Sequence, residues 1–174
     1  MQAQKMTALT PSLAEILHQI GVPFELVEID PAFSDTAAFC EKYHFPLERS
    51  ANTIIVASKK EPKQYAACVV PATRRLDVNH AVKELMNGAK CSFATAEETQ
   101  TLTGMMLGGV TVFGLPASLP IWVDEPLMAF DWVILGGGSR SIKIKISPEV
   151  FKKIANASIL PITISSPEHQ NAAG

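Results

Sequence analysis

The chain has 174 residues, of which 47% are hydrophobic and 18% charged, and its net charge is −2. This composition is too apolar and too weakly charged for a disordered chain, and the balanced charge argues against a general nucleic-acid binder. No apolar run reaches the ~18 residues of a membrane helix, and the first residues lack the apolar stretch of a secretory signal. We therefore expect one soluble, cytoplasmic domain over residues 1–165 and a flexible tail over 166–174.

The first half of the chain predicts a helix, a strand, a second helix and a hairpin. Thr10 is a capping hydroxyl before Pro11, apolar residues then repeat at helical spacing, and Gly21 ends the helix. Two apolar, β-rich runs flank a charged turn, which predicts a hairpin that is central because both of its faces are apolar. In chain order these elements cover about 10–21 (helix), 24–29 (strand), 35–44 (helix), and 53–58 with 65–70 (hairpin).

The second half predicts more helices and strands separated by glycine-rich turns. Asp77 caps one helix, which Asn87 and Gly88 close, and Thr95 begins a capping-box helix that Gly104 ends. The further expected elements are strands at about 120–123, 131–135 and 140–146, a helix over 147–155 and a strand over 159–164. The tight strand–turn–strand steps favour antiparallel or mixed pairing over a doubly wound sheet.

Positive charge gathers in two stretches, 59–75 and 140–153, each with five basic residues and one acidic residue. Together they would hold a phosphate-rich partner if folding brought them to one face. Solvated faces of ordinary elements are the alternative interpretation.

Two glycine-rich segments are candidates for binding through the bare backbone. Gly108 and Gly109 follow the helix end at Gly104, so their N–H groups are candidates to hold an oxyanion or a phosphate. Tight turns in a packed barrel would explain the same glycines. Gly136 to Gly138 precede Ser139 and Arg140, which indicates an anion or ribose contact or, alternatively, a flexible hairpin loop.

No constellation of side chains points to a metal, a cofactor or a nucleophilic triad. The four histidines lack metal-ligand spacing, and no serine lies in a nucleophile elbow. The three cysteines (Cys40, Cys68 and Cys91) are widely spaced without a CxxC pair, which indicates reduced thiols. We expect no cofactor and no metal, so an enzyme built on this chain would work through backbone donors, polar side chains and water.

Six segments match a known family in order and spacing. They are 22–28 (VPFELVE), 52–57 (NTIIVA), 75–79 (RLDVN), 103–114 (TGMMLGGVTVFG), 119–124 (LPIWVD) and 136–140 (GGGSR). With them the chain, from about Pro11 to Leu160, resembles the YbaK/EbsC family. Members of this family are aminoacyl-tRNA deacylase domains that occur free-standing or as the editing insert of bacterial prolyl-tRNA synthetase.

The resemblance implies a single α/β (α+β) domain with a mixed, largely antiparallel, barrel-like sheet flanked by helices. It also implies hydrolysis of the ester between a wrong amino acid and the 3′-terminal ribose of tRNA. Gly108 and Gly109 match the family's pocket loop, where the backbone would polarise the ester carbonyl. Thr53 matches the polar position after a pocket lysine of the family.

The sequence departs from the family at two positions. Asn52 stands where the family has its lysine, and Lys143 stands where well-known members have an acid. We hypothesise a charge exchange across the pocket, in which Lys143 contacts phosphate or ribose and Asn52 hydrogen-bonds substrate. The alternative is that Lys143 is a surface lysine on a two-faced strand. From the second glycine-rich segment, Gly137, Ser139 and Arg140 are further substrate-binding candidates.

The expected function is that of a free-standing, metal-independent, trans-editing deacylase for a small mischarged amino acid. Its expected partner is the 3′ acceptor end of an aminoacylated tRNA, with an aminoacyl-tRNA synthetase as a second candidate and no membrane. The alternative is a catalytically degenerate module of the same fold that binds tRNA or a small ligand, because Asn52 replaces the lysine. A thiol-dependent redox protein is a third interpretation, supported only by scattered cysteines.

Overall fold

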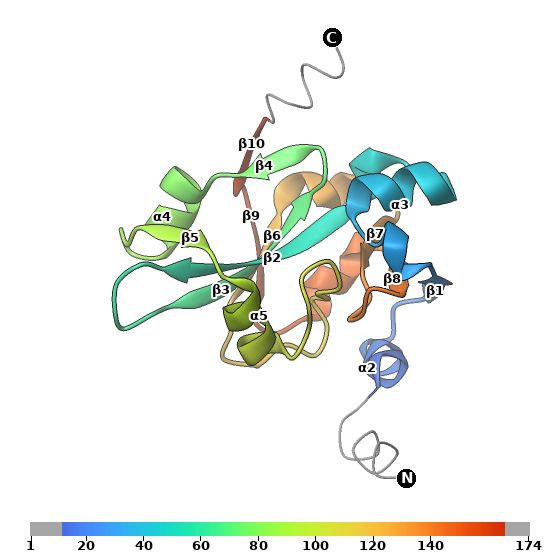
Figure 1. Cartoon of the computed structure of the whole chain (residues 1–174), viewed down its shortest axis with the longest axis horizontal. Helices are drawn as coiled ribbons and strands as arrows, with labels where there is room; N and C mark the ends of the chain where they lie inside the picture. Colours follow the sequence, from blue (N-terminus) through green and yellow to red (C-terminus); the bar gives the residue numbers. More distant parts are fainter. Residues whose placement is uncertain (1–11, 166–174) are drawn as a thin grey trace.

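The computed structural model describes residues 12–165 as two main sheets with helices around them (Figure 1). The larger sheet has the order β5-β2-β3-β6-β9, the smaller one β1-β8-β7, and β10 pairs with β4. The strands are β1 (Phe24–Glu28), β2 (Ala51–Ser58), β3 (Tyr65–Pro71), β4 (Arg74–Leu76), β5 (Cys91–Phe93), β6 (Ile121–Asp124), β7 (Val133–Gly136), β8 (Ile142–Ile146), β9 (Ala157–Leu160) and β10 (Thr163–Ser165). The expected mixed α/β architecture is confirmed, although the barrel-like sheet is not closed.

Helical segments connect these strands. The α-helices are α2 (Leu13–Ile20), α3 (Thr36–Tyr43), α4 (Lys83–Leu85) and α5 (Ala96–Thr103). The 3-10 helices are η1 (Pro31–Phe33), η2 (Leu47–Arg49), η4 (Glu125–Ala129) and η5 (Pro148–Lys153), and η3 (Val78–Val82) is a π-helical turn. No helix within residues 12–165 is long and apolar enough to cross a membrane.

The β2–β3 hairpin lies at the centre of the larger sheet, as its two apolar faces predict. Alternate residues of β2 point into different cores: Ile55 belongs to the core that includes Leu17 and Leu135, whereas Val56 belongs to the core on the other face, which includes Val82. Because a hydrophobic core covers each of its two faces, the hairpin is held in place from both sides. Its partner β6 runs parallel to β3, and β9 runs parallel to β6, so the pairing is mixed.

The smaller sheet holds β8 in its middle. Lys143 on β8 pairs with Val27 on β1 and with Gly136 on β7. A single parallel bridge between Ser50 and Ile134 connects β7 to the segment just before β2. The two sheets therefore meet beside the start of β2, and this junction positions the site described below.

Capping residues set most helix ends where the sequence indicates. α5 has the full capping box between Thr95 and Glu98, and Gly104 ends it with a positive φ of 75°. The start of α2 differs from the expectation, because its N-cap is Ser12, in a capping box with Glu15. Thr10 and Pro11 lie outside the described residues, as does the tail expected over 166–174.

Other elements depart from the sequence prediction for local physical reasons. The helix expected over 147–155 is the 3-10 helix η5, and the one after Asp77 begins with the π-helical turn η3. The strand expected over 159–164 is divided into β9 and β10, since Pro161 has no N–H to donate to a ladder. The buried Asp124 carboxylate holds the chain there, accepting from the Ile162 N–H at 3.0 Å and the Thr163 hydroxyl at 2.6 Å.

Candidate functional site

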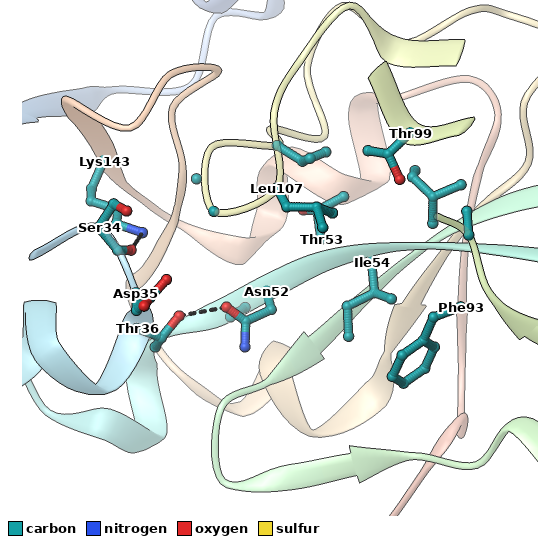
Figure 2. Close-up of a pocket in the computed structure, with 16 residues that line it drawn as sticks. Ser34, Asp35, Thr36, Asn52, Thr53, Ile54, Phe93, Thr99, Leu107 and Lys143 are labelled. Carbon is teal, nitrogen blue, oxygen red and sulfur yellow. Dashed lines mark hydrogen bonds between the residues drawn. The ribbon is translucent and has the colours of Figure 1, made fainter. Parts of the chain in front are cut away.

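A cavity of about 430 Å³ lies where the two sheets meet. Its wall is formed by the start of β2, the start of α3, α5, the loop 107–110 and the facing parts of β7 and β8 (Figure 2). These elements come from distant parts of the chain. The cavity gathers polar side chains at both ends and apolar side chains along its walls, which is the usual make-up of a ligand site.

The floor of the cavity is a stretch of β2 that has a strand partner on one edge only. β3 pairs with β2 along its whole length, whereas β5 pairs only with Val56 to Ser58. The Ile55 carbonyl accepts from the Ala94 N–H, so main-chain groups two residues earlier, at Thr53, point toward the same edge. No described strand pairs with that edge at Thr53, and the cavity opens there.

Lys143 supplies a buried cation to one end of the cavity. Only 7% of the residue is exposed, and its Nζ donates to the Ser34 carbonyl oxygen at 2.7 Å. Its Nζ also lies 5.4 Å from the centre of the Phe39 ring. Among the described residues it has no carboxylate in salt-bridge contact, and burial lowers the pKa of its ammonium group. The alternative that Lys143 is a surface lysine is therefore wrong.

Asn52 lies at the same end as Lys143, beside the start of α3 (Figure 2). Its side-chain carbonyl accepts a hydrogen bond from the Thr36 hydroxyl, which fixes the orientation of the amide. The amide NH₂ donates to no group within residues 12–165, so two donors remain for a ligand. Asp35, the N-cap residue of α3, makes no capping bond with its side chain and also lines this end.

Three buried hydroxyl groups line the cavity without a hydrogen-bond partner in the described part of the chain. They belong to Ser34, Thr53 and Thr99. A buried hydroxyl group without a hydrogen-bond partner lowers the stability of the fold. Because three such groups lie around one cavity, they point to a polar ligand that would supply the missing hydrogen bonds. Of these three residues, only Thr53 is predicted from the sequence. The one signal for Thr99 is its place inside a helix, where threonine is a poor helix former.

The glycine loop contacts the cavity through Gly108, which has a φ of +86°. The Gly108 N–H has no partner among the described residues, whereas the Gly109 N–H already donates to the Met106 carbonyl at 2.9 Å. Gly109 lies behind the wall, where a Cβ would come within 2.8 Å of the Ser139 carbonyl carbon. Of the two predicted glycines, only Gly108 presents a free backbone donor beside the cavity.

Gly137, Ser139 and Arg140 do not line this cavity. The Arg140 guanidinium instead donates to the carbonyl oxygens of Leu107 at 3.1 Å and Pro31 at 3.5 Å, which fastens the glycine loop to η1. The Ser139 hydroxyl accepts from the Ser141 N–H within the same turn. The substrate contacts predicted for these three residues stay predictions, and the observed contacts hold the wall in place.

No histidine or cysteine within residues 12–165 lines the cavity. No group of three or more His, Cys, Asp or Glu side chains within residues 12–165 is placed to hold a metal ion. Cys40, Cys68 and Cys91 are free and buried, and burial raises the pKa of each thiol. Thiols of raised pKa form little thiolate, which disfavours the redox interpretation.

Comparison with known proteins gives one family and several structures of the same fold. A family model for the aminoacyl-tRNA editing domain matches residues 30–154. The hypothetical protein APE2540 is 25% identical, with a TM-score of 0.78 over 87% of this chain and 99% of that one. A candidate trans-editing enzyme for prolyl tRNA synthetase is 21% identical, with a TM-score of 0.75 over 90% of this chain and 99% of that one. A candidate signal transduction protein from Marinobacter aquaeolei VT8 is 15% identical, with a TM-score of 0.57 over 86% of this chain and 30% of that one.

A buried cation without a carboxylate partner destabilises the protein that contains it, so Lys143→Met is expected to raise the melting temperature. We expect a rise of at least ~2 °C at neutral pH, because a hydrophobic residue of similar volume replaces a desolvated charge. The folded-state pKa of Lys143 is lowered by burial, so its destabilising effect is full below that pKa. The effect declines as the pH rises above that pKa, and it is gone only above the ordinary lysine pKa of the unfolded chain. The difference in melting temperature between wild type and Lys143→Met is therefore expected to become smaller at alkaline pH.

The matched control is Lys145→Met on the same strand, whose ammonium group is partly exposed and lies 3.6 Å from the Glu25 carboxylate. This variant is expected to show no rise in melting temperature. A lower melting temperature for Lys143→Met than for wild type would contradict the interpretation, since it would make the lysine a structural residue.

Proposed function

The chain belongs to the aminoacyl-tRNA editing domain family, and from that premise we propose that it is a trans-editing deacylase for a small mischarged amino acid on tRNA. The observation that carries the proposal is the cavity itself, which is lined by a residue with a buried ammonium group, by residues with unpartnered hydroxyl groups and by a glycine whose N–H makes no hydrogen bond in the described chain. Action in trans is suggested by the candidate trans-editing enzyme, since 99% of its chain is covered by this fold.

In the proposed reaction the ester carbonyl lies against the Gly108 N–H. Water attacks the carbonyl carbon, and the negative charge that develops on the carbonyl oxygen is stabilised by this backbone donor. The bond between the acyl carbon and the ribose oxygen then breaks, and the ribose oxygen takes up a proton that the water loses. The products are a free amino acid and a tRNA with a free terminal hydroxyl group.

Lys143 and Asn52 hold the nucleotide part of the substrate in this proposal. Among residues 12–165, the Lys143 ammonium group is the one cation that lines the cavity, so it pairs with the phosphate or the ribose of the terminal nucleotide. The Asn52 NH₂ group, fixed by Thr36, donates to the same part of the substrate. The charge supplied in the family by a lysine on the central strand is thus supplied here from β8.

The rim of the cavity suits the terminal base. Phe93 is 56% exposed and Leu107 is 52% exposed, and both line the cavity. An exposed aromatic ring beside such a site is a stacking surface for an unpaired base. We assign this role to Phe93.

Further phosphate contacts are proposed at a second cavity, of about 310 Å³, which we call the lysine pocket. It is lined by Lys59, Lys83 and Lys90 together with Val78, Asn79 and Cys91. No carboxylate lines it, and none of the three lysines has an ion-pair partner among the described residues. The pocket adjoins β5, whose other end, at Phe93, lines the main cavity.

The two basic stretches seen in the sequence do not form one face. The β2–β3 turn and β8 lie at opposite sides of the molecule in Figure 1. Several of their cations are already engaged: Lys63 with Glu98, Lys145 with Glu25 and Lys152 with Glu149. Contact with the tRNA backbone is therefore proposed through the lysine pocket rather than through the two stretches jointly.

The proposed activity is tested by incubating the purified protein with tRNAs that carry alanine, serine, threonine or cysteine. We expect release of at least one amino acid well above spontaneous hydrolysis, unchanged by EDTA. Lys143→Met is expected to lower kcat/KM by about 100-fold, the order of effect found when one preorganised electrostatic contact is removed, whereas Lys145→Met leaves it within twofold. If the protein binds tRNA and hydrolyses none of the esters, the function is binding alone, as Asn52 in place of a lysine would then suggest.

The lysine pocket is tested by the salt dependence of tRNA binding. The triple variant Lys59→Ala/Lys83→Ala/Lys90→Ala is expected to bind more weakly and to reduce the slope of log K against log salt by about 2, since each single-strand phosphate contact contributes ~0.7. Lys152→Ala, which removes a lysine paired with Glu149, serves as the control and is expected to leave the slope unchanged. Equal slopes for the triple variant and wild type would remove the pocket from the tRNA contact surface.

A further inference from the structure

We infer that the hydroxyl groups of Thr53 and Thr99 form the subsite for the amino-acid side chain, and that this subsite selects an amino acid bearing a hydroxyl group, with serine as the simplest case. The inference rests on the proposed deacylase function and names the class of amino acid that the enzyme removes.

The two threonines approach the cavity from different elements. Thr53 belongs to β2 and Thr99 to α5, and Figure 2 shows the Thr99 hydroxyl pointing from the helix toward the strand that carries Thr53. Thr99 is 1% exposed, and the Thr53 hydroxyl oxygen is itself buried. Neither hydroxyl has a hydrogen-bond partner within the described chain, so each keeps its full capacity to donate and to accept.

Helix formation does not explain the Thr99 hydroxyl. Within α5, the Thr103 hydroxyl donates to the carbonyl oxygen one turn earlier, that of Thr99, at 2.7 Å. Threonines in helices commonly satisfy themselves in this way. Thr99 does not do so, and its hydroxyl is left buried and unbonded in the wall of the cavity.

The surroundings of the two hydroxyls suit a small neutral side chain. The other lining residues near this part of β2 and α5 are apolar, among them Ile55, Ala94 and Val110. The ionisable groups of the cavity, Lys143 and Asp35, lie at the other end, beside Ser34 and Thr36 (Figure 2). A nucleotide phosphate at Lys143 therefore leaves the threonine end for the amino-acid side chain.

Selection follows from the cost of leaving buried polar groups without partners. A serine hydroxyl would donate to one threonine oxygen and accept from the other, whereas an alanine methyl would leave both threonines unbonded. Sites built to hydrogen-bond a substrate hydroxyl reject the analogue that lacks it far more strongly than apolar pockets reject one methylene. The inference thus predicts discrimination between two amino acids of nearly equal size.

The test compares seryl and alanyl esters on the same tRNA, so that all tRNA contacts are held constant. Wild type is expected to hydrolyse the seryl ester at least about tenfold faster in kcat/KM. Thr99→Val and Thr53→Val are each expected to lower kcat/KM for the seryl ester about tenfold. For the alanyl ester each variant is expected to change kcat/KM by less than about twofold. Thr99→Ser, which keeps the hydroxyl, is expected to retain the preference, and Thr101→Val on the exposed face of α5 serves as the matched control.

A second readout separates substrate binding from a structural role. Valine has nearly the shape of threonine, so removing an unpartnered hydroxyl is expected to leave the melting temperature of the free protein unchanged or raised. Three results would overturn the subsite and leave the deacylase function standing. They are equal hydrolysis of the two esters by wild type, an equal fall of kcat/KM for both esters in Thr99→Val, and a lowered melting temperature of the valine variants. Hydrolysis of no ester by wild type would overturn both.

Discussion

The site depends on one constraint of the larger sheet, namely that β2 has a partner on one edge along its whole length and on the other edge only from Val56 to Ser58. Main-chain groups at an open edge need partners, and a strand buried on both faces cannot turn them to solvent. α5 and the loop 107–110 cover the open edge without pairing with it, and a cavity remains between them. The strand that is most firmly held by the core thus also forms the floor of the site.

The loop that covers this edge is held by contacts that require glycine. A Cβ at Gly136 would come within 2.2 Å of the Val110 carbonyl oxygen, so β7 and the loop approach as bare backbones. Arg140 then fastens the same loop to η1 through two carbonyl oxygens. For the Gly136–Arg140 segment the sequence predicts a substrate contact or a flexible hairpin loop. In the structure the contacts of Gly136 and Arg140 hold the loop that carries Gly108 beside the cavity.

The sequence predicts those features that local pattern determines. The hairpin, α5 and β8 follow from apolar periodicity and capping residues, and Asn52, Thr53, Gly108 and Lys143 were identified and do line one cavity. Ser34 and Thr99 were missed because an ordinary hydroxyl becomes informative only when packing buries it without a partner. Thr36 was missed because its hydrogen bond to Asn52 joins residues 16 positions apart and exists only in the folded chain. The division of the last strand at Pro161 also depends on a distant residue, Asp124, whose carboxylate accepts the next N–H.

The central claim is that the cavity holds the nucleotide at Lys143 and the amino-acid side chain between Thr53 and Thr99. A crystal structure with a non-hydrolysable analogue, seryl-3′-amino-3′-deoxyadenosine 5′-monophosphate, tests it most directly. The account predicts the phosphate nearest Lys143, the carbonyl oxygen at the Gly108 N–H and the seryl hydroxyl between the two threonines. An analogue bound outside the cavity, or bound with its phosphate toward Thr99, would contradict the account.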